Sequence, residues 1–367
     1  MGQGAGETAY ERLFTPWKLG KFEIRNRICV PPLVVFNWGD ESGCVSEKSV
    51  RHYEALTRGG AGLVIQEATS VSRGGRITCT MLGIWEDGQI EGLSRLARVF
   101  HDADMPAILQ LSHAGILAER EADRVAPVPY RCVADGTERV GRGLSAEELA
   151  RLEQDFIDGA RRAIQAGYDG VELHASHGYL LSELLNGRMN QRTDAYAASD
   201  RLFFLHVMEG IRRIAPPDFL IGVRLGAFEP ALEDGLENAA WFESHGADFI
   251  DAFIGCDWAM DLEKPDTFPF NESIYGAKRI RERVSVPVFA VSGISTGRGA
   301  EEVLKATGAD MAVIGRGSLV NENWGNDVRA GRNPGRCQEC ARCMWKVDAD
   351  RCPGHLLLEK ERAGQTE

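Results

Sequence analysis

The sequence lacks the features of a membrane or secreted protein. It contains no run of about 20 apolar residues that would span a bilayer, and its opening stretch, MGQGAGETAYERLF, has no apolar segment of a signal peptide. Short internal repeats and low-complexity stretches are also missing. With 44% hydrophobic and 26% charged residues the composition is that of a folded protein, and we expect a cytoplasmic location.

Basic residues are fewer than acidic ones, 42 against 54. The formal net charge is −12, which argues against nucleic acid or an anionic membrane as the main partner. An anionic cofactor would therefore need local basic residues. The chain has nine cysteines, but without a secretion signal we expect reduced thiols rather than a disulfide framework.

Apolar, β-rich segments alternate with helical segments along most of the chain. Eight strands are predicted, at Ile28–Val35, Gly62–Ala68, Ala107–Leu111, Val171–His174, Leu220–Leu225, Phe249–Ile254, Val288–Val291 and Met311–Ile314. Because most of them lack polar alternation, we expect strands buried on both faces. Helices between evenly spaced parallel strands predict an α/β fold, a (β/α)8 TIM barrel, rather than an open sheet.

The barrel is expected to cover residues 13–330. A flexible N-terminus (1–12) should precede it, its first element should be a hairpin at Leu13–Arg27, and a cysteine-rich tail (331–367) should follow it. The clearest helix, Ser145–Ala166, begins with a capping box and ends at Gly167. The long stretch His113–Gly143 is interpreted either as a lid over the site or as a plain surface insertion.

Chemistry-bearing side chains gather after the fourth predicted strand. His174, His177 and Tyr179 follow one another within six positions, in the segment Val171–Arg192. The carboxyl ends of barrel strands are where such enzymes place their active sites. A lone histidine is more often structural, but two imidazoles and a phenol together can hold one oxygen atom and deliver a proton beside it.

A second pattern follows the last two strands. Gly293 and Gly315 allow close backbone approach, and Arg316 can form paired hydrogen bonds with phosphate oxygens. Barrels often bind phosphate at these two loops, although glycines at strand ends also simply turn the chain. The pattern indicates a phosphate site.

Several longer segments resemble one family. The chain is similar to the old yellow enzyme family of FMN-dependent ene-reductases, also called NADH:flavin oxidoreductases, over about Leu13 to Leu319. The matching segments are LFTPWKLGKFEIRNRI, GLVIQEAT, LQLSHAG, GYDGVELHASHGYLL, NQRTDAY, GVRL, PVFAVSGIST and ADMAVIGRGSL. The resemblance implies the same barrel, with FMN as cofactor and NADH or NADPH as electron donor.

The resemblance also implies catalytic roles. His174 and His177 would hold the carbonyl oxygen of an α,β-unsaturated substrate, so that a hydride from reduced flavin N5 can add to the β-carbon. Tyr179 would protonate the α-carbon, and its phenol stays protonated at an ordinary pKa of about 10. The nicotinamide and the substrate would use the same pocket in alternation.

Cofactor contacts are implied in the same way. Arg224 would face flavin N1 and O2, Gln110 and Ala68 would bind the pyrimidine edge, Pro32 and Leu33 would line the ring, and Gly293, Gly315 and Arg316 would hold the phosphate. Two positions depart from the family pattern. Val34 replaces the usual Cys or Thr, which predicts a shifted flavin potential, and Phe36 replaces a Tyr that is common in one branch.

The tail carries four closely spaced cysteines: Cys337, Cys340, Cys343 and Cys352. Four thiolates at such spacing can surround one tetrahedral ion or one iron–sulfur cluster. Family members resembling 2,4-dienoyl-CoA reductase and trimethylamine dehydrogenase carry a four-iron cluster just past the barrel. That resemblance favours a [4Fe-4S] cluster over zinc or unligated thiols, and implies an electron-transfer protein as a possible partner.

Three functions are compatible with these patterns. The first is reduction of an enone or enoyl compound by NAD(P)H through the flavin. The second is a flavoprotein dehydrogenase or demethylase passing electrons through an iron–sulfur cluster, and the third is a non-enzymatic redox or metal sensor. Tyr179 and the histidine pair favour the first, because amine oxidation needs no protonation of carbon. A homo-oligomer is compatible with all three.

Overall fold

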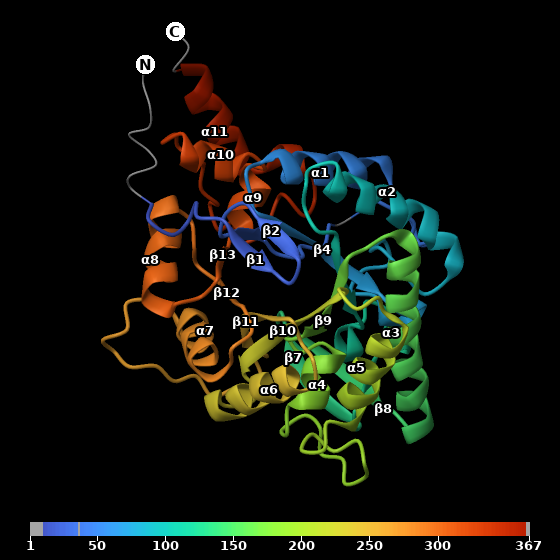
Figure 1. Cartoon of the computed structure of the whole chain (residues 1–367). Helices are drawn as coiled ribbons and strands as arrows, with labels where there is room; N and C mark the ends of the chain where they lie inside the picture. Colours follow the sequence, from blue (N-terminus) through green and yellow to red (C-terminus); the bar gives the residue numbers. More distant parts are fainter. Residues whose placement is uncertain (1–9, 36, 365–367) are drawn as a thin grey trace.

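The computed structural model describes residues 10–35 and 37–364. In this part of the chain eight parallel strands close into a barrel with helices outside it (Figure 1). Neighbouring strands follow sequence order around the barrel, and the last pairs with the first, Ala312 beside Ile28. The predicted (β/α)8 barrel and its eight strands are therefore confirmed. The first nine residues of the predicted flexible N-terminus, and Phe36, lie outside the described residues.

The barrel strands are short and almost wholly buried. They are β3 (Ile28–Val30), β4 (Leu63–Ser70), β5 (Ile108–Ser112), β9 (Gly170–Ala175), β10 (Leu220–Phe228), β11 (Phe249–Gly255), β12 (Val288–Val291) and β13 (Met311–Val313). The first is shorter than predicted, because Pro31 and Pro32 have no backbone N–H to donate to a neighbouring strand. The chain beyond β3 is thereby free to line the mouth of the barrel.

The helices pack their apolar faces on the barrel. They are α1 (Glu47–Arg58), α2 (Ile90–His101), α3 (Ala146–Ala166), α4 (Leu180–Leu185), α5 (Leu202–Ile214), α6 (Leu232–Ser244), α7 (Glu272–Arg283), α8 (Gly297–Thr307), α9 (Arg316–Val320), α10 (Trp324–Arg329) and α11 (Pro353–Gly364). The predicted capping box of α3 is confirmed, with Ser145 and Glu148 bonded reciprocally and Gly167 left-handed. Within the described residues, no helix has the length and apolarity needed to cross a bilayer.

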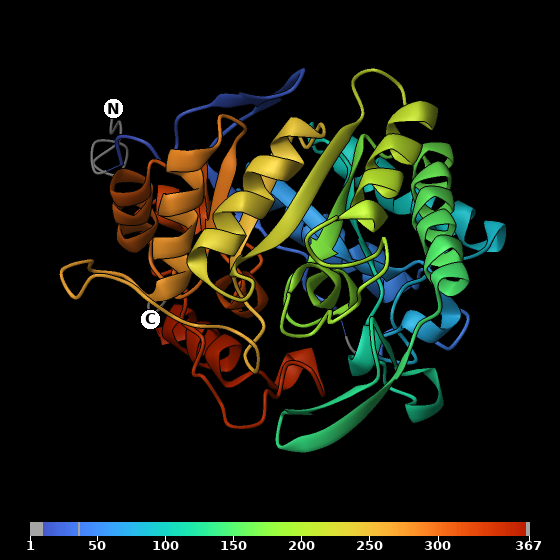
Figure 2. The same ribbon diagram turned by 90° about the horizontal axis from the view of Figure 1, so that it is seen from below.

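Two hairpins lie at opposite ends of the barrel (Figure 2). The predicted N-terminal hairpin is present as β1 (Trp17–Leu19) and β2 (Phe22–Ile24), and buries Leu19 and Ile24 against the core. The stretch His113–Gly143 forms β6 (Val125–Ala126), β7 (Tyr130–Ala134) and β8 (Thr137–Gly143). In Figure 2 the β7–β8 hairpin lies at the same end of the barrel as the C-terminal tail.

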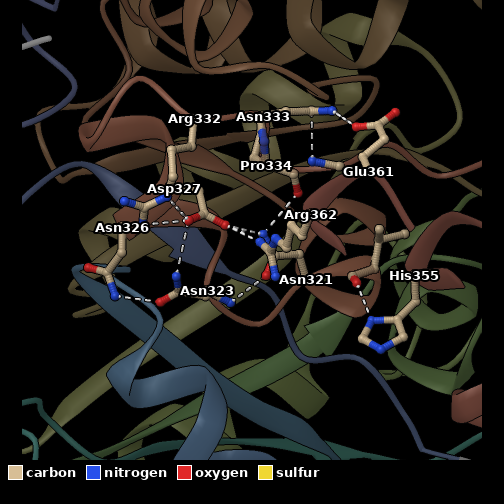
Figure 3. Close-up of polar contacts among 12 residues, drawn as sticks. Asn321, Asn323, Asn326, Asp327, Arg332, Asn333, Pro334, His355, Glu361 and Arg362 are labelled. Carbon is tan, nitrogen blue, oxygen red and sulfur yellow. Dashed lines mark hydrogen bonds and ion pairs between the residues drawn. The ribbon is translucent and has the colours of Figure 1, made fainter. Parts of the chain in front are cut away.

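The tail is attached to the barrel through a buried carboxylate (Figure 3). Asp327 in α10 is only 2% exposed. It accepts hydrogen bonds from Asn321 (2.8 Å), from Arg332 (2.9 Å) and, on α11, from Arg362 (2.5 Å). On the same helix, His355 contacts the backbone oxygen of Val320 through Nδ1 at 2.9 Å. These contacts hold α11 against α9 and α10, so the tail has a defined position at the barrel mouth.

Candidate active site

Two adjacent cavities open at the carboxyl ends of the strands. The larger, of about 440 Å³, is lined by the ends of β10 to β13 and by the tail residues Gly335 and Cys337. The smaller, of about 260 Å³, is lined by the segment after β3, by the end of β9 and by the tail residue Trp345. Leu33, His177 and Arg224 line both, so the two cavities are parts of one site.

The end of β9 brings three of the predicted residues together. The Nε2 atom of His174 lies 3.1 Å from Nδ1 of His177, and the His174 and Tyr179 rings are 4.8 Å apart. The His177 ring stacks on Phe253 at 3.9 Å. His177 also has a positive φ of 65°, a backbone strain that often occurs where a side chain must point into a site.

Burial sets the protonation states of this group. It lowers the pKa of both imidazoles well below 6.5, and the positive charge of Arg224 adds to that effect. Burial raises the pKa of Tyr179 to about 12, and Asp135 in the β7–β8 hairpin contributes to the shift. At neutral pH the site thus offers two neutral imidazoles and a protonated phenol. No residue of the stretch His113–Gly143 lines either cavity, so the lid and the plain surface insertion both stay open.

Beside the histidines lies a buried polar network. Arg224 donates to Asp251 at 2.9 Å, and Gln110 donates to Glu172 at 2.7 Å. Asp251, Glu172 and Gln110 have no exposed surface. Burial raises the pKa of both carboxyls, while Arg224 opposes the rise.

Four side-chain atoms of this network lack a partner. Gln110 Oε1, Glu172 Oε2, Asp251 Oδ1 and Arg224 Nε are buried without a hydrogen-bond partner among the described residues. Unsatisfied buried polar groups are costly and rare in folded proteins. Of these four residues Arg224 lines the cavities, so its free N–H group is placed to donate to an acceptor atom of a bound ligand.

The far end of the larger cavity contains the three residues predicted to bind phosphate, Gly293, Gly315 and Arg316. Gly293 has a positive φ of 69° and Ser292 one of 117°, so the loop after β12 turns sharply at the cavity wall. A Cβ atom at Gly315 would lie in the space near Pro31 and Leu33. Arg316 lines this end and forms an ion pair with Glu339 of the tail at 3.1 Å.

Most of the predicted site residues meet at these cavities. The residues that line them are Pro32, Leu33, His174, His177, Tyr179, Arg224, Gly293, Gly315 and Arg316. Ala68 and Gln110 lie buried at paired positions of β4 and β5 and do not line either cavity. Sequence reasoning missed Phe253, although it lies near the carboxyl end of β11. It also missed Trp345 and Arg336, for which only the folded tail gives a signal.

The four tail cysteines are not gathered into one group in this structure. Cys337 is half-buried at the wall of the larger cavity and Cys352 is buried beside Trp345, whereas Cys340 and Cys343 are exposed. Across residues 10–35 and 37–364, no group of three or more His, Cys, Asp or Glu side chains is placed to hold a metal ion. Cys337 and Cys352 pack against the same apolar cluster, which contains Val35, Val320 and Trp345. Binding of a metal ion or cluster by the four cysteines stays a prediction.

The fold and the site together define a class: a (β/α)8 barrel with Gly293, Gly315 and Arg316 after its last two strands and a His–His–Tyr group after its fourth. The sequence then identifies the family. Residues 12–334 match the NADH:flavin oxidoreductase / NADH oxidase family. The chain belongs to this family, that of the old yellow enzyme.

Solved structures share the fold. An old yellow enzyme homologue from Zymomonas mobilis is 25% identical with a TM-score of 0.72, over 87% of this chain and 93% of that one. Morphinone reductase in complex with tetrahydroNAD is 25% identical with a TM-score of 0.70, over 87% and 91%. A 2-naphthoyl-CoA reductase in complex with 2-naphthoyl-CoA has a TM-score of 0.79 at 21% identity, which shows the fold alone; this chain spans 53% of its length.

Proposed function

We propose that this protein is an FMN-dependent ene-reductase, which reduces the C=C bond of α,β-unsaturated carbonyl compounds with electrons from NADH or NADPH. The observation that carries the proposal is the neutral His174–His177 pair with the protonated Tyr179 phenol, all lining one cavity beside Arg224. Morphinone reductase, solved with tetrahydroNAD, supports a nicotinamide as the electron donor.

FMN fits the larger cavity by its chemistry. Arg224 lines that cavity, and its unpartnered Nε would donate to the acceptor atoms at the pyrimidine edge of the flavin. Gly293, Gly315 and Arg316 would hold the phosphate. When bound, the reduced flavin supplies the hydride that adds to the β-carbon of the substrate.

The histidines act on the carbonyl group. A substrate oxygen between the two rings accepts a hydrogen bond from each and replaces their direct contact of 3.1 Å. The exchange costs little, since one hydrogen bond is given up and two are formed. Because both imidazoles are neutral, they polarise the carbonyl without losing a proton to it, and the β-carbon becomes electron-poor.

Tyr179 supplies the proton. Its ring lies 4.8 Å from that of His174 and lines the same cavity. With its pKa raised to about 12 the phenol is fully protonated at neutral pH, so it can donate to the α-carbon as negative charge develops there. Tyr179 and the two histidines follow the same strand. The proton should therefore reach the alkene from one defined face.

The proposal is tested with flavin-loaded protein under anaerobic conditions. NADH or NADPH should bleach the flavin, and a cyclic enone, a maleimide or an enoyl thioester should restore its colour in a second step. Tyr179→Phe should leave the first step at its wild-type rate and slow the second by about 10²-fold or more. Equal slowing of both steps would refute the proton-donor role, and protein that takes up no FMN would refute the function.

A further inference from the structure

The tail does more than carry cysteines: it forms walls of both cavities. Gly335, Arg336, Cys337 and Glu339 line the larger cavity, and Trp345 with Lys346 lines the smaller one. None of these contacts is explained by a metal site. The substrate cavity therefore has a wall from outside the barrel proper.

Trp345 is the most firmly held of these residues. It is 4% exposed and packs in an apolar cluster with Val35, Val320 and Cys352. Its ring lies 5.5 Å from that of Trp38 and 5.9 Å from that of His52. Aromatic groups at such separations attract one another and restrict each other's rotation.

The two rings that contact Trp345 are uncharged at neutral pH. Burial lowers the pKa of His52 to about 4, with a contribution from Lys48, so that imidazole is uncharged. Charged groups lie beside these rings: Lys48 Nζ is 4.6 Å from the centre of the Trp38 ring, and Glu322 Oε1 is 4.0 Å from Nδ1 of His52. The cluster fixes the indole in one orientation, with part of it at the cavity.

The cavity that Trp345 lines has two chemical characters. Its polar groups are His174, His177, Tyr179, Arg224 and Lys346, and its apolar lining comes from Pro32, Leu33, Val34, Ile77, Leu319 and Trp345. If the histidines hold the carbonyl oxygen, the remainder of the substrate must lie against the apolar lining. A rigid indole there stabilises a flat apolar group through stacking or edge contact. It excludes a bulky branched group, because closely packed side chains cannot move far to make room.

We propose that Trp345 is a specificity-determining residue, and that the substrates are enones or enoyl compounds with a planar, apolar substituent on the alkene. The part of this proposal that concerns turnover rests on the proposed function. The part that concerns binding does not, because a phenol held by the histidine pair would contact the same Trp345 wall.

The test compares Trp345→Ala and Trp345→Phe with wild type in flavin-loaded protein. The matched control is Val347→Ala, a neighbouring tail residue that is 47% exposed and lines neither cavity. The probes are 4-phenyl-3-buten-2-one, its 4-cyclohexyl analogue and 2-cyclohexenone. Wild type should prefer the phenyl over the cyclohexyl compound in kcat/KM, and Trp345→Ala should shrink that ratio by about tenfold. Trp345→Phe should fall between them, while Val347→Ala keeps the wild-type ratio within about twofold. Cyclohexenone, which has no such substituent, reports the part of the change that is common to all substrates.

A ratio unchanged in Trp345→Ala would overturn the proposal, and so would an equal shift in Val347→Ala, since the effect would then come from general loosening of the tail. Binding keeps the test separate from turnover. The dissociation constants of 4-phenylphenol and phenol, read from their charge-transfer bands on the flavin, should show the same loss of preference in Trp345→Ala. If no enone is reduced but this loss is seen, the proposed function fails and the role of Trp345 stands. If the phenol preference is unchanged, the proposal fails.

Discussion

Removing the Asp327 carboxylate should release the tail from the barrel. Asp327 is 2% exposed and accepts from Asn321, Arg332 and Arg362. Removing one partner of a buried ion pair typically costs about 3–5 kcal/mol. Here the side chains of Arg332 and Arg362 are 61% and 46% exposed, so water can replace part of the loss, and we expect about 2 kcal/mol for Asp327→Ala.

That free energy corresponds to a roughly 30-fold larger open fraction of the tail. Amide hydrogen exchange should therefore be about 30-fold faster along α11 in Asp327→Ala, with Asp327→Asn in between because it keeps the shape and loses the charge. Glu361→Ala is the control: this α11 residue is exposed and accepts only from Asn333 in the contacts of Figure 3. Its α11 exchange should change by less than about twofold.

Two results would refute this reasoning. Exchange along α11 that is the same in Asp327→Ala and Glu361→Ala would show that the buried carboxylate does not hold the tail. Equal acceleration in α3, on the other side of the barrel, would show a global loss of stability instead of local release.

Three further predictions concern the site and the core. Replacing His174 and His177 together by Ala should abolish the charge-transfer band of a para-substituted phenolate while FMN stays bound; full band intensity would disprove the assignment. Burial raises the pKa of Glu229 to about 8 from 4.5, so its contribution to stability is full below pH 4.5 and is lost as pH rises through 8. The fall in melting temperature between pH 5 and 8 should be shallower in Glu229→Gln than in wild type. Identical slopes in the two proteins would count against the raised pKa of Glu229. Glu339→Gln frees Arg316 from its ion pair and should tighten FMN binding about two- to fivefold at low salt, less at high salt; weaker binding would show that Glu339 helps to hold the cofactor.

The barrel was predictable from the sequence because its strands are buried on both faces and therefore read as apolar runs between helices. The capping box at Ser145 was predictable because the signal lies within four residues. The His174, His177 and Tyr179 group was predictable for a similar reason, since one strand end brings all three together. Bounds were less accurate where proline intervened, as at Pro31, which ends the first strand early.

The position of the tail was not predictable, because it depends on contacts between distant parts of the chain. Asp327 binds Arg362 although other arginines are closer in the sequence. Trp345 contacts Trp38 and His52, which lie about 300 residues earlier in the chain. No periodicity or spacing in the sequence carries such information. The cysteine spacing was visible and suggested a ligand set, yet the apolar neighbours that hold Cys352 could be recognised only in the folded tail.

The C-terminal tail supplies part of the walls of both cavities. A barrel alone presents strand ends to solvent, and its loops must supply every wall. Here the β7–β8 hairpin places Asp135 close enough to influence Tyr179, and the tail places Trp345 in the substrate cavity and Glu339 on Arg316. Because one carboxylate, Asp327, fixes the tail, a change there should reach both cavities although it contacts neither. Release of the tail should therefore change the wall that Trp345 forms beside the histidine pair, as well as the hydrogen exchange of α11.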